Sequence, residues 1–164
     1  MTRILEIEPA NDRELALARW IDAPTAAIWR AWTEPHLLEQ WFCPKPWRVT
    51  DVKQEIRPGG ASFMIMRGPN GEEMPMHGVF LEIVPERRIV FTDAFTSAWV
   101  PSEKPFMAAS VEMTPMDGGT RYIARAGHWT VADREKHEQM GFHQGWAIAT
   151  DQLEEVARGL GVAA

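Results

Sequence analysis

The sequence predicts an α+β protein in which a curved antiparallel sheet packs against a long helix near the carboxyl terminus. Two observations predict this class. Residues 139–160 carry an apolar stripe at helical spacing, whereas the middle of the chain is a series of short apolar–polar runs separated by Gly, Pro and Asn-Gly turns. The runs do not alternate with helical segments, as a parallel sheet would require, so an antiparallel meander is expected.

The predicted helix spans Val131 to Gly159. At about 28 residues it would be roughly 40 Å long, since each residue adds 1.5 Å. Its apolar stripe comprises Phe142, His143, Trp146, Ala149, Thr150, Leu153, Val156, Ala157 and Leu160. A helix of this length needs one long partner surface, and the space between it and the sheet is the expected place for a functional site.

Seven strands are predicted. The first covers residues 14–21, and two short helices follow, over residues 22–34 and 36–42, each ending before a proline. The other six strands are expected at residues 47–56, 62–67, 76–84, 88–95, 106–114 and 120–127. Residues 1–12 are predicted to be a flexible or edge segment, within one domain of residues 1–164 whose core covers about residues 14–160.

Period-two alternation assigns the strand faces. The side chains expected to face the helix are Met64, Met66, Ile89, Phe91, Ala109, Val111, Met113, Tyr122, Ala124 and Ala126. The strand at residues 76–84 is ambiguous. Either His77, Val79, Leu81 and Ile83 point inward, or a bulge near Gly78 shifts the register and Met76 and Phe80 do so instead.

Composition limits the function classes. Apolar residues make up 45% of the chain and charged residues 24%, with no run near the roughly 18 apolar residues that span a bilayer. No secretory leader pattern is visible, so a cytoplasmic location without membrane insertion is expected. A net charge of −6 argues against nucleic-acid binding. His137 and His143 are six residues apart, and Cys43 is the only cysteine, so neither a metal site nor a cofactor is expected.

Five segments resemble the START-like (SRPBCC, helix-grip) superfamily. They read IDAPTAAIWRAWTEPHLLEQWF, RPGGASFMIMRGPNGEE, HGVFLEIVPERRIVFTD, DGGTRYIAR and GWAIATDQL. Within the superfamily, the chain is similar to bacterial homologues of the heat-shock protein 90 ATPase activator. The resemblance implies a cavity between the long helix and the sheet that holds a lipid-like or polycyclic molecule. Two positions depart from the family pattern, because Cys43 stands where glycine is common and Thr150 where leucine is usual.

The primary functional expectation is therefore binding of a small, largely apolar molecule in that cavity. Large apolar side chains and a few polar groups are typical of such sites. The predicted ligand-binding residues are Trp41, Phe42, Trp47, Met64, Met66, His77, Phe91, Trp99, Met113, Tyr122, His143, Trp146 and Thr150.

Two alternatives remain open. A cyclase- or hydrolase-type enzyme would use Asp93, Tyr122 and His143, because acid–base catalysis needs polar groups within hydrogen-bond reach of one another. A protein-interaction module, linked to a chaperone or to a second copy of the chain, would use the Trp-rich rim of the expected cavity. This rim comprises Trp41, Phe42, Trp47, Trp99 and Phe106. On the rim, the loop from Ala94 to Pro105 is expected to be either a lid over the cavity or a contact patch.

Overall fold

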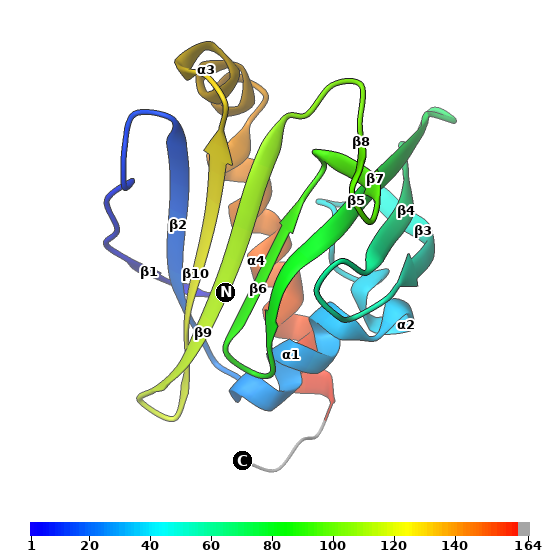
Figure 1. The fold of residues 1–164 in the computed structure, drawn as a ribbon. Helices are drawn as coiled ribbons and strands as arrows, with labels where there is room; N and C mark the ends of the chain where they lie inside the picture. The colour runs from blue at the N-terminus through cyan, green and yellow to red at the C-terminus, as the bar shows by residue number, and fades with distance from the viewer. Residues whose placement is uncertain (161–164) are drawn as a thin grey trace.

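The computed structural model describes residues 1–160, which build an eight-stranded antiparallel sheet with a long helix running along it (Figure 1). The strand order is β1–β2–β10–β9–β6–β5–β4–β3. The strands are β1 (Arg3–Leu5), β2 (Glu14–Ile21), β3 (Arg48–Gln54), β4 (Ala61–Arg67), β5 (Glu73–Val84), β6 (Arg88–Thr92), β9 (Met107–Met116) and β10 (Gly119–His128). The α+β class and the antiparallel sheet are thereby confirmed, and the last four residues of the predicted domain lie outside the described residues.

One helix, α4 (Phe142–Gly159), runs along the sheet, and the shorter helices lie near its two ends. Helices α1 (Thr25–Thr33) and α2 (Pro35–Leu38) lie near one end of α4, and α3 (Val131–Gln139) lies at the other (Figure 1). Pro35 occupies the first turn of α2, where a missing N–H costs nothing. Among residues 1–160, no helix is long and apolar enough to cross a membrane.

The predicted count of seven strands in the sheet was one too low. The additional strand is β1, which pairs with β2 at the edge of the sheet through Arg3 opposite Trp20 and Leu5 opposite Ala18. Three residues are too few to show alternation, so the sequence indicates only an edge segment there. A separate two-stranded hairpin, β7 (Phe95–Ser97) with β8 (Val100–Pro101), forms in the loop that was considered a lid.

The single helix predicted over Val131–Gly159 is two helices. Helix α3 is capped by Thr130, whose side chain accepts a hydrogen bond from the Asp133 N–H, and α4 begins after Gly141. Gly141 has φ +98°, a conformation that suits glycine because it lacks a Cβ. This residue ends one helix and changes the direction of the next, so the helical phase of residues 131–139 does not continue into α4.

The predicted inner faces of β9 and β10 are confirmed. Ala109, Val111, Met113, Tyr122, Ala124 and Ala126 are all buried. In β5 the register changes between Phe80 and Glu82, so the bulge is at Leu81 rather than near Gly78. As a result, Phe80 and Ile83 both pack with the core. His77, which precedes the bulge, lies opposite Phe63 of β4 with ring centroids 4.9 Å apart.

Candidate functional site

An apolar pocket of about 350 Å³ lies between α4, α1 and the inner face of the sheet. Within residues 1–160, the lining residues come from widely separated parts of the chain and include no Lys, Arg, Asp or Glu. They are Trp32, Trp41, Phe42, Cys43, Pro44, Met66, Met76, Phe91, Met107, Tyr122, His137, Met140, Gly141, Phe142, Gly145, Trp146, Ala149 and Thr150. This is the cavity location that the sequence predicted.

The structure places some of the predicted ligand-binding residues in this pocket. These are Trp41, Phe42, Met66, Phe91, Tyr122, Trp146 and Thr150. The rings of Trp41, Phe42 and Phe91 are connected through Trp32. Trp32 contacts Trp41, Phe42 and Phe91 with centroid separations of 5.0, 5.7 and 5.8 Å. Edge and tilted contacts of this kind hold the aromatic wall in place.

Other predicted residues do not line the pocket. Met64 and Met113 point inward as expected, but they are buried in the core, and Trp47 packs against that core. His77 lies against Phe63, and Trp99 is 65% exposed on the β7–β8 hairpin, where it contacts Phe95. The predicted positions of these two residues were wrong, because His77 shares with Phe63 the face opposite to that of Met64 and Met76, and Trp99 lies in the turn of the hairpin.

The predicted position of His143 was also wrong. It lies in the first turn of α4, its side chain is 53% exposed, and its Nε2 is 3.1 Å from an oxygen of Glu138 on α3. The helix break at Gly141 turns this histidine out of the apolar face that begins with Phe142.

The three residues of the enzyme alternative do not come together. Only Tyr122 lines the pocket. Asp93 follows β6, and its Oδ1 accepts hydrogen bonds from the backbone N–H groups of Phe106 (2.8 Å) and Met107 (3.1 Å). This carboxylate therefore closes the base of the loop that carries the β7–β8 hairpin.

Sequence reasoning missed several pocket residues, above all His137. Its ring lies at the end of α3, is 8% exposed and packs on Phe142 and Trp146 at centroid separations of 5.2 and 6.1 Å. Gly141 was the available signal, because a glycine shortly after Lys136 and His137 is typical of a helix end. Met76, Met107 and Met140 were also missed.

His137 is joined to a second histidine. Its Nδ1 is 2.8 Å from Nε2 of His128 at the end of β10. Burial and the neighbouring His128 lower the pKa of His137 to about 4. At neutral pH this imidazole is therefore uncharged, which suits a pocket without charged side chains.

The other polar groups of the pocket are also neutral. Tyr122 is buried, and its hydroxyl oxygen accepts a hydrogen bond from Trp32 Nε1 at 3.2 Å, while burial raises the pKa of the phenol. Burial likewise raises the pKa of the Cys43 thiol to about 11, so Cys43 is not an activated nucleophile. Thr150 donates its hydroxyl hydrogen to the Trp146 carbonyl at 2.6 Å.

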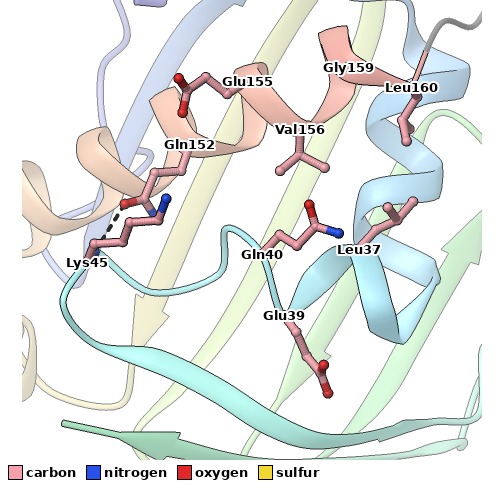
Figure 2. A pocket seen from close by; sticks show the side chains of 9 residues that line it. All are labelled: Leu37, Glu39, Gln40, Lys45, Gln152, Glu155, Val156, Gly159 and Leu160. Carbon is pink, nitrogen blue, oxygen red and sulfur yellow. Dashed lines mark hydrogen bonds between the residues drawn. The ribbon is translucent and has the colours of Figure 1, made fainter. Parts of the chain in front are cut away.

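One wall of the pocket is held by Gln152, on the polar side of α4. Its Nε2 donates to the carbonyls of Trp41 (2.9 Å) and Cys43 (2.7 Å), and its Oε1 accepts from the Lys45 N–H at 3.1 Å. This side chain also lines a groove of about 610 Å³, whose lining residues are drawn in Figure 2. The groove has charged residues along it, including Glu39, Lys45 and Glu155, so it differs in chemistry from the apolar pocket.

Comparison with known proteins places the chain among its relatives. Residues 22–158 match the family described as Activator of Hsp90 ATPase homolog 1-like protein. The chain belongs to this family. The resemblance seen in the sequence is confirmed, and the fold agrees with a helix-grip arrangement.

Solved structures of other proteins agree with this family assignment. A crystal structure of a Nitrosomonas europaea protein is 40% identical, covers 94% of this chain and 98% of its own, and has a TM-score of 0.89. A Mycobacterium smegmatis protein at 22% identity (96% and 99% covered) and a Rhodobacter sphaeroides protein at 20% (96% and 100%) share the fold, with TM-scores of 0.79 and 0.82. Comparison with curated proteins found no match.

Proposed function

We propose that this family member binds a small, largely apolar molecule in the pocket between α4 and the sheet. The observation that carries this proposal is a hollow of about 350 Å³ to which the described part of the chain contributes no Lys, Arg, Asp or Glu. Ligand sites are commonly apolar clefts of about 300–1,000 Å³ with a few polar groups, so this volume points to a small ligand.

The kinds of side chain in the wall support the same function. Seven of the lining residues are Trp, Phe or Tyr, and four are Met. Aromatic rings provide large rigid contact surfaces, and Met side chains adapt to irregular shapes. Met140, which is 69% exposed, lines the pocket beside the α3–α4 junction and so offers a movable side chain where a ligand would enter.

The proposal is tested by mass spectrometry of the protein isolated from its own cells, recorded under native and under denaturing conditions. We expect a small molecule that accompanies the folded chain and is released on unfolding. Ala149→Leu adds bulk to the pocket wall and should abolish its retention, whereas Gln144→Leu, at an exposed position of the same helix, should not. Equal retention by Ala149→Leu would place the molecule elsewhere and contradict the proposal.

A second candidate, a protein-interaction module, is favoured by the exposed apolar end of the β7–β8 hairpin. Trp99 is 65% and Val100 51% exposed. Paired large apolar side chains in solvent are typical of contact surfaces. Sedimentation over a range of protein concentrations tests whether a second copy of the chain covers these two side chains. Self-association that Trp99→Ser removes would support this function. A monomer at every concentration would oppose self-association through the hairpin.

A further inference from the structure

The hydrogen bonds of His128 determine which of its ring nitrogens carries a proton. The Arg13 carbonyl oxygen is 2.8 Å from His128 Nδ1, and it also accepts from the His128 backbone N–H at 3.0 Å. A carbonyl oxygen can only accept hydrogen bonds, so Nδ1 must be the donor. A neutral imidazole holds one proton, so with Nδ1 protonated, Nε2 of His128 has a lone pair.

This assignment determines the tautomer of the neighbouring His137. Since His128 Nε2 is an acceptor, His137 Nδ1, 2.8 Å away, must donate a hydrogen to it. A neutral His137 then has its lone pair on Nε2. Within residues 1–160, no protein group forms a hydrogen bond to this Nε2, although its ring lines the pocket.

The pocket has a second group with unused hydrogen-bonding capacity, and this one is a donor rather than an acceptor. The Tyr122 oxygen accepts from Trp32 Nε1, and in the described part of the chain no acceptor pairs with the Tyr122 hydroxyl hydrogen. Tyr122 lies beside α1, whereas His137 packs on Phe142 and Trp146 at the start of α4. The pocket therefore offers one free acceptor at His137 and one free donor at Tyr122.

We infer that the pocket selects an uncharged, largely apolar molecule with an O–H or N–H group that donates a hydrogen bond to His137 Nε2. The carboxylate of the same shape is rejected. The inference rests on the proposed function of the pocket. A carboxylate would bring its oxygen lone pairs against that of Nε2, with no Lys or Arg in the wall to balance the charge. A molecule without the donor would leave Nε2 unpaired, so it binds more weakly.

The tautomer is measured first, on the unchanged protein and without ligand. Long-range ¹H–¹⁵N NMR at pH 8 distinguishes protonated from unprotonated ring nitrogens. We expect His137 to carry its proton on Nδ1 and a bare nitrogen at Nε2. A proton on Nε2 of His137 would overturn the inference while leaving the pocket function intact.

Ligand selection is then measured by calorimetry at pH 8 with three probes of similar shape: 2-naphthol, 2-methylnaphthalene and 2-naphthoate. We expect 2-naphthol to bind roughly threefold to tenfold more tightly than 2-methylnaphthalene, the ratio expected from one hydrogen bond. The carboxylate 2-naphthoate should bind more weakly than both.

His137→Phe keeps an aromatic ring in place but removes the acceptor, and His143→Phe makes the same change at the exposed histidine. The preference for 2-naphthol over 2-methylnaphthalene should disappear only in His137→Phe, with binding of 2-methylnaphthalene retained. Equal binding of these two probes by the unchanged protein would overturn the inference but not the pocket. If no probe binds, the proposed function fails and the inference fails with it.

Discussion

His137 and His143 are six residues apart, yet one lies inside the molecule and the other outside. His137 is buried among Phe106, Phe142 and Trp146, whereas the His143 side chain is 53% exposed beside Glu138. The difference arises at Gly141, whose φ of +98° separates the two helices. A histidine's role here depends on the path of the backbone, and two residues of one predicted helix can therefore have opposite environments.

The largest expected difference between them is in stability. His137→Ala removes a buried ring and its hydrogen bond to His128, so the free energy of unfolding should fall by about 2–4 kcal/mol. His143→Ala removes an exposed contact with Glu138 and should change it by less than about 0.5 kcal/mol. Urea unfolding of both variants measures this, and equal losses would show that His137 is not a packed residue.

The next effect is the pH dependence of stability. The pKa of His137 is lowered from 6.5 to about 4 on folding, so the unfolded chain binds the proton more readily. Its contribution to stability is therefore complete above about pH 6.5 and is lost as the pH falls toward 4, by on the order of 2 kcal/mol.

Thermal unfolding between pH 4 and pH 7 measures this loss, with His137→Phe as the control because it cannot titrate. As the pH falls, the unchanged protein should lose stability relative to His137→Phe, by on the order of 2 kcal/mol near pH 4. A parallel pair of curves would mean that the His137 imidazole titrates alike in the folded and unfolded chain.

The smallest expected effect concerns the residue that separates the two environments. Gly141→Ala places a Cβ at φ +98° and should lower the free energy of unfolding by about 1–2 kcal/mol. Gly159→Ala, at the last residue of α4, adds a Cβ that meets no other atom within 4 Å, so it should have little effect or stabilise slightly. Chemical denaturation measures the free energy of unfolding of both variants. If Gly141→Ala loses no stability, the backbone at residue 141 is not strained, which would argue for a continuous helix.

Sequence reasoning predicted the inner faces of β9 and β10 because side chains alternate between the two faces of a strand, although Ile123 on the other face of β10 is buried as well. Tyr122, Ala124 and Ala126 are buried for this reason, and so are Val111 and Met113 opposite them. The same reasoning did not separate the pocket wall from the packed core. Met66 lines the pocket and Met64 does not, although both share one face of β4, because the difference depends on what lies above each side chain.

The site was harder to predict because its polar groups come from long-range contacts. Tyr122 pairs with Trp32 of α1, and His137 with His128 across the β10–α3 connection. Gln152 holds the segment Trp41–Lys45 from the polar side of α4, where helical periodicity indicates only a solvent-facing residue. No local sequence pattern predicts such side-chain pairs.

The sequence by itself determined the α+β class, the antiparallel strands and the family, because these depend on periodicity and on short segments. The tertiary structure alone decided which histidine enters the pocket, where β5 bulges and which side chains are left with a free hydrogen-bonding group. The physical reason is that periodicity applies within one regular element. A single glycine or bulge resets it, and contacts between distant elements then determine each side chain's environment.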